Sequence, residues 1–284
     1  MTLTSSDEEL PHEVSGFAVN SRGALSNVAV EARPEPRLRA EKVTAGYGGV
    51  PVIRDVSISV GQGEIVAVIG PNGAGKSTML KSLVGILRVT AGHVWLGRDE
   101  VTNRPPEELA RRGVGYVPQV NDIFEPLTVA ENLEMGGYLL APRRIPGRIE
   151  EVGAIFPALP PMLKRRADKL SGGERKMLAI ARVLMLDPTV LILDEPTANL
   201  SPKLADSLLR EQVTRLAAAG KAVLLVEQRA RAALQVADWT SVLVSGETRL
   251  EGRPSDLLKR QDFEELFLGA GPRPAAPEVE EDER

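Results

Sequence analysis

The stretch GPNGAGKST at residues 70–78 constrains the fold of this chain more than any other part of its sequence. It matches the phosphate-binding pattern G-x-x-x-x-G-K-[ST]. The fixed positions of that pattern are Gly70, Gly75, Lys76 and Ser77. The apolar run EIVAVIG (64–70) predicts a buried strand before the loop, and KSTMLKSLVGIL (76–87) has the apolar spacing of a helix face. A strand, this loop and a helix in that order predict an α/β fold with a parallel sheet.

The residue types in this loop suit the chemistry of phosphate binding. Glycines let backbone N–H groups approach phosphate oxygens closely, and the helix N-terminus adds the positive end of its dipole. Lys76 can reach the β- and γ-phosphates of ATP, and Ser77 can ligate Mg²⁺. A chance glycine-rich turn is the alternative, and the flanking strand and helix argue against it. The residues predicted to bind the nucleotide here are Gly70, Pro71, Asn72, Gly73, Ala74, Gly75, Lys76, Ser77 and Thr78.

A second candidate site lies in TVLILDEP (189–196), where two carboxylates follow a continuous apolar run. Ligands of open α/β sheets gather at the carboxyl ends of the strands, so this is where a metal and a base are expected. Asp194 is predicted to hold Mg²⁺, directly or through water, and Glu195 to activate the attacking water as a general base. The alternative is that a strand-end carboxylate only caps the next turn.

Several functions are disfavoured by composition. The net charge of −4 provides no basic field for nucleic acid. The chain has no cysteine, which excludes disulfides and thiolate metal sites, and only His12 and His93 could supply imidazole. No apolar stretch approaches the roughly 20 residues that span a bilayer, and the acidic N-terminus lacks the basic region of a signal peptide. We therefore expect no direct insertion into a membrane.

The segment KLSGGERKMLAIARVLM (169–185), between the two phosphate motifs, resembles the signature of the ABC ATPases. The resemblance covers roughly residues 38–268. It implies that Ser171, Gly172 and Gly173 form an anion cradle at a helix N-terminus and serve the nucleotide held by a second ATPase subunit. Two such subunits would enclose two ATP molecules head to tail, as a homodimer or a heterodimer, and hydrolysis would release the dimer.

Two further positions match the family one at a time. Tyr47, in AGYGG, corresponds to the aromatic residue that stacks on adenine, although packing at a strand end would also explain it. Gln119, in VGYVPQ, corresponds to the glutamine that reaches Mg²⁺ and the attacking water and links to a helical subdomain. The segment NDIFEPLTVAENLEMGGYLL (121–140) corresponds to the surface that receives the coupling helix of a permease; its apolar residues could instead fold inward.

The resemblance also implies an architecture. We expect a P-loop NTPase core of the RecA-like type with an antiparallel β subdomain and an inserted α-helical subdomain at about 120–180. AVLLVEQ (222–228) reads as another buried strand, and SVLVSGETRLEG (241–252) as a hairpin that turns at Ser245–Gly246. Residues 1–37 are expected to be a disordered N-terminal extension, and residues 269–284 an acidic disordered tail.

The sequences of several motifs indicate a branch of the family. ENLEMGGY, KMLAIARVLM, ANLSP and LLVEQ look most like the ATP-binding subunit of branched-chain amino-acid importers, and importers of urea and short amides share much of it. The lipopolysaccharide-export ATPase is also similar, but usually carries aspartate and histidine where this chain has Ser201 and Gln228. The importer reading implies a peripheral subunit on the cytoplasmic side of the cell membrane, docked to integral permease subunits.

The sequence disfavours two other classes of function. A soluble ABC ATPase acting on nucleic acid or ribosomes usually carries two ATPase domains or long coiled-coil insertions, which this sequence lacks. A regulatory nucleotide-binding module that hydrolyses little is disfavoured by the intact Glu195.

Ser201 and Gln228 depart from the general pattern of the family. Ser201 replaces an aspartate that contacts the partner's phosphate loop, and its hydroxyl can form a hydrogen bond but carries no charge. Gln228 replaces a histidine that contacts the γ-phosphate. An amide can donate to a phosphate oxygen and accept from water, but it cannot carry a proton near neutral pH. The predicted catalytic residues are therefore Glu195, Gln119 and Gln228, although Gln228 could simply solvate the strand end.

Overall fold

The computed structural model describes residues 18–19, 25–26, 33–120, 122–260 and 263. The chain divides into two compact units, Met1–Arg33 and Pro34–Arg284. In the first unit, β1 (Ala18–Val19) pairs antiparallel with β2 (Leu25–Ser26). The rest of the expected N-terminal extension up to residue 32, and the expected acidic tail, lie outside the described residues.

The centre of the second unit is a six-stranded sheet in the order β12-β11-β5-β10-β9-β8. Neighbouring strands run parallel except that β12 is antiparallel to β11. The strands are β5 (Ile65–Ile69), β8 (Val114–Val117), β9 (Val190–Asp194), β10 (Ala222–Glu227), β11 (Trp239–Val244) and β12 (Glu247–Gly252). The hairpin between β11 and β12 turns at Ser245 and Gly246, which both have positive φ, as the sequence predicted.

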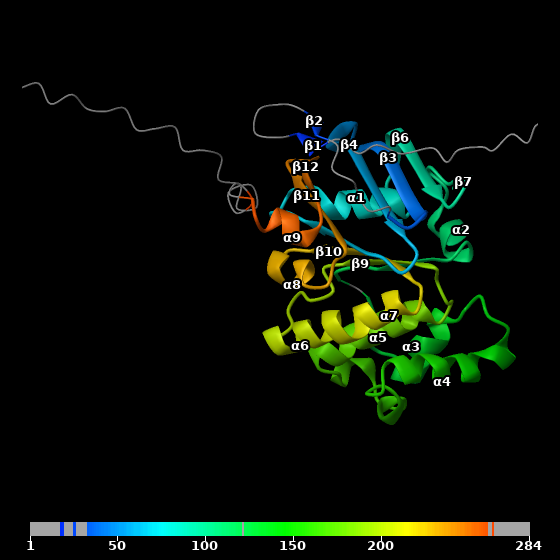
Figure 1. Cartoon of the computed structure of the whole chain (residues 1–284). Coiled ribbons are helices and arrows are strands. Elements are labelled where there is room, and N and C mark those ends of the chain that lie inside the picture. The colour runs from blue at the N-terminus through cyan, green and yellow to red at the C-terminus, as the bar shows by residue number, and fades with distance from the viewer. Residues whose placement is uncertain (1–17, 20–24, 27–32, 121, 261–262, 264–284) are drawn as a thin grey trace, which may run out of the picture. The chain divides into compact units, whose positions relative to one another are not determined.

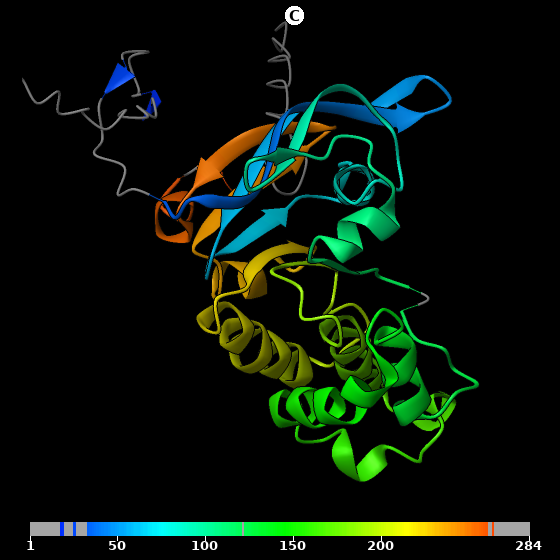
Figure 2. The same ribbon diagram turned by 90° about the vertical axis from the view of Figure 1, so that its right-hand side faces the viewer.

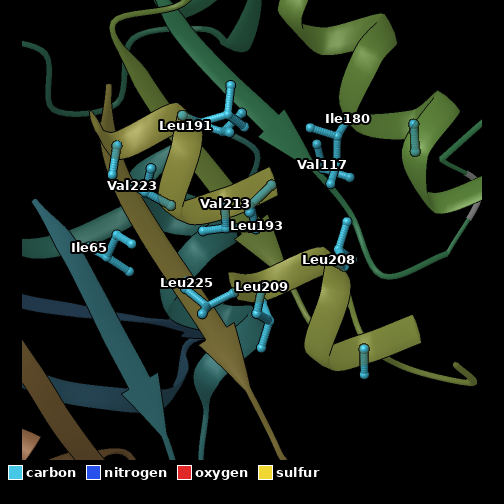
Figure 3. Close-up of a cluster of buried hydrophobic side chains, with 14 of the residues drawn as sticks. Ile65, Val117, Ile180, Leu191, Leu193, Leu208, Leu209, Val213, Val223 and Leu225 are labelled. Atoms are coloured by element: carbon cyan, nitrogen blue, oxygen red, sulfur yellow. The ribbon is translucent and has the colours of Figure 1, made fainter. Parts of the chain in front are cut away.

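Both faces of this sheet are covered, which explains the continuous apolar runs. Every residue of β5, β9 and β10 is buried. Successive side chains point to opposite faces, so Ile65 and Ala67 belong to different hydrophobic clusters from Val66 and Val68. Figure 3 shows the first cluster, in which Leu193 of β9 and Leu225 of β10 meet side chains from the helical segment after residue 201.

A four-stranded antiparallel sheet in the order β4-β3-β6-β7 forms a second layer. Its strands are β3 (Pro36–Tyr47), β4 (Val50–Gly61), β6 (Val89–Leu96) and β7 (Asp99–Glu100). The helix α1 (Lys76–Leu83) packs against β3 and β4 on one side and β9 on the other. The second core is therefore shared by both sheets and α1, which confirms the expected antiparallel β subdomain beside the nucleotide-binding core. β3 already begins at Pro36, inside the range that the sequence assigned to the extension.

The described part of the chain contains eight further α-helices. They are α2 (Pro106–Arg111), α3 (Val129–Gly136), α4 (Ile145–Ile155), α5 (Gly172–Leu184), α6 (Pro202–Ser207), α7 (Thr214–Ala218), α8 (Ala230–Leu234) and α9 (Pro254–Leu257). Short 3₁₀ turns occur at Pro142–Arg144, Pro160–Met162 and Ala167–Lys169, and a π-helical turn at Leu208–Val213 joins α6 to α7.

The helices α3, α4 and α5 pack against one another and form a separate group. Figures 1 and 2 show this group, drawn in green, on the side of the central sheet away from β3 and β4. It corresponds to the inserted helical subdomain expected at about 120–180, although α5 extends to Leu184. None of the helices that the structure describes is long and apolar enough to cross a bilayer.

The core around β9 supplies a test of this packing. Leu193 has no exposed surface and lies in the cluster of Figure 3, whereas Leu258 is 60 % exposed. Leu193→Ala should lower the free energy of unfolding by about 2–5 kcal/mol, because it removes buried methyl groups and leaves a cavity. Leu258→Ala should change it by less than about 0.5 kcal/mol. Urea denaturation followed by circular dichroism measures both values, and equal losses would contradict the described core.

Candidate functional site

The register of the parallel strands brings the predicted site residues to one edge of the sheet. Val117 pairs with Leu193, and in the next ladders Asp194 pairs with Val226 and Glu227 with Ile69. The four strands therefore end at nearly the same level. The segments that leave this edge carry Gln119 after β8, Asp194 and Glu195 at the end of β9, Gln228 after β10, and the phosphate loop after β5.

The phosphate loop is closed by its own lysine. Lys76 Nζ donates to the carbonyl oxygens of Gly70 at 2.8 Å and Pro71 at 3.1 Å. Gly75 has φ 100° at the N-cap of α1, a conformation that L side chains rarely adopt, and a Cβ at Gly70 would collide with the carbonyl of Leu243. Burial lowers the pKa of Lys76, and the carboxylates of Glu195 and Asp194 act in the opposite direction.

Asp194 forms the candidate metal site together with Ser77. Ser77 Oγ donates to Asp194 Oδ1 at 3.4 Å, and the Tyr116 hydroxyl donates to Oδ2 at 3.4 Å. Asp194 is only 3 % exposed, and this burial raises its pKa, while the two hydrogen bonds act to lower it. Tyr116 was not predicted from the sequence, because its contact with Asp194 depends on the pairing of β8 with β9.

Glu195 is held in a strained conformation directly after β9. Its φ is 46°, which costs about 1–3 kcal/mol for a residue other than glycine. Its N–H donates to the carbonyl of Val226 at 2.9 Å. One carboxylate oxygen lies 3.8 Å from Lys76 Nζ, and the other accepts a hydrogen bond from Gln119 Nε2 at 2.8 Å. The carboxylate of Glu195 is thus fixed between the phosphate-loop lysine and Gln119.

The loop that carries Gln228 is fastened at two points to the loop after Glu195. On one side of Gln228, the carboxylate of Glu227 accepts a hydrogen bond from the N–H of Thr197 at 3.0 Å. On the other side, Arg229 Nη2 donates to the carbonyl of Leu200 at 3.1 Å. Gln228 itself is exposed. The loop that carries Ser201 and the loop that carries Gln228 are therefore joined on both sides of this glutamine.

Ser201 has a local structural role that was not predicted from the sequence. Its Oγ accepts a hydrogen bond from the N–H of Leu204 at 3.4 Å and caps α6. The hydroxyl, which we expected to face a partner subunit, is thus engaged within its own chain.

The signature segment (169–185) contains the N-terminus of α5, a second helix N-terminus besides that of α1. Ser171 caps α5, since its Oγ accepts from the N–H of Glu174 at 3.3 Å while the Glu174 carboxylate accepts from the N–H of Ser171 at 2.7 Å. This reciprocal pair is a capping box, and it fixes where α5 begins. Ser171 and Gly172 are exposed, and Gly173 packs against Leu204. Figure 1 shows α5 among the helices and α1 between the sheets, so the two helix N-termini are separate.

The predicted site residues fall into two sets. Beyond the backbone of the phosphate loop, five of them lie in one cluster. Lys76 and Gln119 both contact Glu195, Ser77 contacts Asp194, and the chain itself joins Lys76 to Ser77 and Asp194 to Glu195. In the part of the chain that the structure describes, no hydrogen bond or ion pair joins the other set to this cluster. That set consists of Tyr47, Gln228, Ser171, Gly172 and Gly173. Tyr47, at the end of β3, is 50 % exposed.

The model of one protein family, the ABC transporter, matches residues 53–198 of the chain. A probable branched-chain amino acid transport ATP-binding protein of Archaeoglobus fulgidus is 41 % identical over 233 residues, which covers 82 % of this chain and 98 % of that protein. A high-affinity branched-chain amino acid transport ATP-binding protein of Pseudomonas aeruginosa is 37 % identical, over 82 % of this chain and 99 % of that protein.

Two further comparisons bear on the branch and on the fold. The lipopolysaccharide export ATP-binding protein of Escherichia coli is 33 % identical, over 82 % of this chain and 97 % of that protein. Among solved structures, the ADP conformation of an ATP-binding cassette of an ABC transporter superposes with a TM-score of 0.73 at 30 % identity. It covers 82 % of this chain and 99 % of that cassette.

The buried carboxylate of Glu227 supplies a test of the loop contacts. Burial raises its pKa, so the folded chain binds this proton more tightly than the unfolded chain does. The ionised carboxylate therefore makes folding less favourable as the pH rises through the raised pKa. Glu227→Gln keeps an oxygen for the N–H of Thr197 and removes the charge, so the variant should be more stable than the parent at about pH 8, with a smaller difference at about pH 5.

Thermal unfolding at a series of pH values measures this difference. The exposed Glu150 on α4 offers the control Glu150→Gln, which should show no such pH-dependent gain. A gain for Glu227→Gln that did not grow with pH would contradict the described burial.

Proposed function

Because this chain belongs to the ABC transporter family of ATP-binding subunits, we propose that it energises an importer of branched-chain or other hydrophobic amino acids. As a member of that family it is an ATPase coupled to transmembrane transport. One observation carries the assignment of the hydrolytic centre: the Glu195 carboxylate is fixed between Lys76 and Gln119 at the edge of the sheet. A base held beside the phosphate-binding lysine suits attack of water on a terminal phosphate.

The phosphates are assigned to the loop of residues 70–78. Its backbone N–H groups and the N-terminus of α1 supply a cradle of positive potential. Lys76 is the cation nearest to Glu195 in this loop, so its ammonium group is suited to the β- and γ-phosphates. The adenine is assigned to Tyr47, whose half-exposed ring at the end of β3 could stack on a base.

The residues beside Lys76 fit a magnesium ion. Mg²⁺ prefers oxygen ligands and is commonly held by one or two carboxylates together with substrate phosphates. Ser77 Oγ and the buried Asp194 carboxylate converge at 3.4 Å, and Gln119 is assigned as a further ligand. The described residues contain no group of three or more His, Cys, Asp or Glu side chains that could hold a metal, and phosphate oxygens and water would complete the ligand set of Mg²⁺. The ion would neutralise charge on the phosphates.

The proton chemistry is assigned to Glu195. The hydrogen bond from Gln119 Nε2 occupies one of its oxygens and orients the other toward the side of Lys76. Water placed there would give a proton to Glu195 as its oxygen attacks the γ-phosphorus, while the bond from that phosphorus to the oxygen of the leaving ADP breaks. Gln228 is assigned as a sensor of the γ-phosphate, because its exposed amide can donate to an oxygen without taking part in proton transfer.

A second ATPase subunit is expected to complete each site. Ser171 and Gly172 are exposed at the N-terminus of α5, and the two bonds of the capping box use the N–H groups of Ser171 and Glu174 but not those of Gly172 and Gly173. This anion cradle lies on a different helix from the phosphate loop. It is therefore assigned to the nucleotide of the partner subunit.

A groove beside the helical group supports docking of a permease. Its volume is 520 Å³, and its lining is mostly apolar, including Ile86 after α1 and Leu186 after α5. Phe124, Met135 and Tyr138 also line it and are between 45 and 59 % exposed, so these apolar side chains do not fold inward. An exposed apolar groove of this kind fits an amphipathic helix. We assign it to a helix of the integral permease, which implies a peripheral position on the cytoplasmic side of the membrane.

The choice of substrate rests on similarity. The two branched-chain amino acid relatives are 41 and 37 % identical to this chain, and the lipopolysaccharide export relative is 33 % identical. Ser201 and Gln228 also differ from the aspartate and histidine usual in the export branch. An importer of urea or short amides is the second candidate, because the ATPase subunits of that class share many of these motif sequences with this chain.

Replacement of the proposed base tests the hydrolytic assignment. Glu195→Gln keeps the size of the side chain but cannot accept a proton, so the rate of ATP hydrolysis should fall by about 10²–10⁴-fold. ATP binding should persist and the ATP-bound dimer should accumulate, which size-exclusion chromatography with ATP measures. Lys76→Ala should instead abolish tight ATP binding. Near-normal turnover by the Glu195→Gln variant would contradict the assignment of Glu195 as the general base.

Replacement of Gln228 tests its role as a sensor. Loss of a hydrogen bond to a charged oxygen typically costs 1.5–3 kcal/mol, so Gln228→Ala should lower kcat by about tenfold or more in the assembled transporter. Gln228→His should keep the activity that Gln228→Ala loses. Its kcat should also change as the pH passes ~6.5, where the imidazole titrates, and that of the parent should not. Unchanged ATPase activity in Gln228→Ala would mean that the glutamine only solvates the strand end.

A further inference from the structure

Lys176 is a buried lysine in the second turn of the signature helix α5. The residue is only 8 % exposed, which is unusual for a lysine on a helix unless its charge is paired. Its Nζ forms an ion pair with Asp122 Oδ2 at 2.6 Å and donates to the backbone carbonyl of Gln119 at 2.8 Å. The Asp122 side chain is itself 13 % exposed. Lys176 thus binds two residues of the segment that leaves β8.

The contact with Gln119 connects α5 to the hydrolytic centre. The same Gln119 donates from Nε2 to Glu195 Oε2 at 2.8 Å, and Glu195 Oε1 lies 3.8 Å from Lys76 Nζ. A continuous series of polar contacts therefore runs from the phosphate-loop lysine through Glu195 and Gln119 to Lys176. Lys176 lies three residues after Gly173, about 4.5 Å along the helix from the anion cradle.

We propose that Lys176 is a positioning residue that holds Gln119 against Glu195 and fixes the N-terminus of α5 relative to that pair. It sets the place of the general base and the place of the signature cradle together. This inference rests on the proposed ATPase function. It adds a residue on the helical side of the site to those that the phosphate motifs define.

The other contacts between α5 and this segment lack these properties. Arg175 Nη1 lies 3.1 Å from Glu125 Oε1, but the two side chains are 40 and 61 % exposed, and such pairs contribute little. The Arg182 guanidinium lies 4.9 Å from the centre of the Phe124 ring, beside the apolar groove. Among the described residues of α5, Lys176 is the side chain that bonds to Gln119.

The two partners of Lys176 have separable roles. Asp122 balances the buried charge, and breaking a buried ion pair destabilises a fold because one charge is left without a partner. The Gln119 carbonyl receives the bond that fixes the peptide of the residue touching Glu195. If Lys176 only stabilises the fold, its ion pair with Asp122 is sufficient. If Lys176 positions Gln119, its bond to the Gln119 carbonyl is required.

Lys176→Met tests the proposal because methionine keeps the apolar stem and removes both bonds. The full-length chain should keep its dissociation constant for ATP within about twofold, since the residue does not touch the phosphate loop. Its kcat should fall by about tenfold to 100-fold, because a misplaced base slows the chemical step more than binding. Lys176→Arg, which can still donate to the carbonyl and the carboxylate, should recover most of kcat.

Two variants separate positioning from stability. Asp122→Asn removes the ion pair but leaves the bond to Gln119, so it should lower Tm while changing kcat by less than about threefold. In the double variant Lys176→Met/Asp122→Leu no buried charge is left unpaired, so Tm should recover toward the parent value while kcat stays low. Recovery of kcat together with Tm in the double variant would show a structural role and overturn the proposal.

Lys221 offers a matched control. Its Nζ pairs with Asp187 Oδ1 at 2.6 Å, and its side chain is 17 % exposed, but it precedes β10 at the end of the sheet opposite the site. Lys221→Met should lower Tm without changing kcat. Parent-like kcat in Lys176→Met would overturn this inference alone. Absence of ATP hydrolysis in the parent chain would overturn the proposed function and this inference with it.

Discussion

The in-register pairing of four buried parallel strands is the constraint on which the rest of this molecule depends. β8, β9, β10 and β5 end at nearly the same level, so Gln119, Glu195, Gln228 and the phosphate loop leave the sheet side by side. Because side chains alternate along a strand, a slip of one residue would exchange the side chains that β9 contributes to the two hydrophobic clusters and move Asp194 away from Ser77. The two hydrophobic clusters therefore fix the geometry of the site as well as the stability of the fold.

That edge concentrates charge in a largely buried place. Lys76, Asp194 and Glu227 are each no more than 5 % exposed. Desolvation opposes the charged form of all three, lowering the pKa of the lysine and raising those of the two carboxyls. Hydrogen bonds from Ser77, Tyr116 and Thr197 offset part of this cost. The positive φ of Glu195 adds backbone strain at the same place, which is where functional sites commonly store it.

The sequence predicted those parts of the molecule that depend on local patterns. The phosphate loop, the buried strands β5, β9 and β10, the hairpin at Ser245–Gly246 and the start of α5 could all be read from spacing and turn chemistry. It did not predict contacts between distant segments: Tyr116 with Asp194, Lys176 with Gln119, or Glu227 with Thr197. Such contacts depend on strand order and helix packing, and the residues involved have no distinctive local spacing.

Ser201 separates two properties that a single residue commonly couples, the stability of its own helix and the charge of a surface proposed to meet a partner subunit. Its hydroxyl caps α6, and aspartate, the residue common in the family at this position, is an equally good helix cap. An exchange of serine and aspartate would therefore leave the local fold intact while adding or removing one negative charge on the surface that we propose to face the partner subunit. A lineage could adjust the electrostatic attraction between two subunits at this position in a single step, without first compensating for a damaged helix.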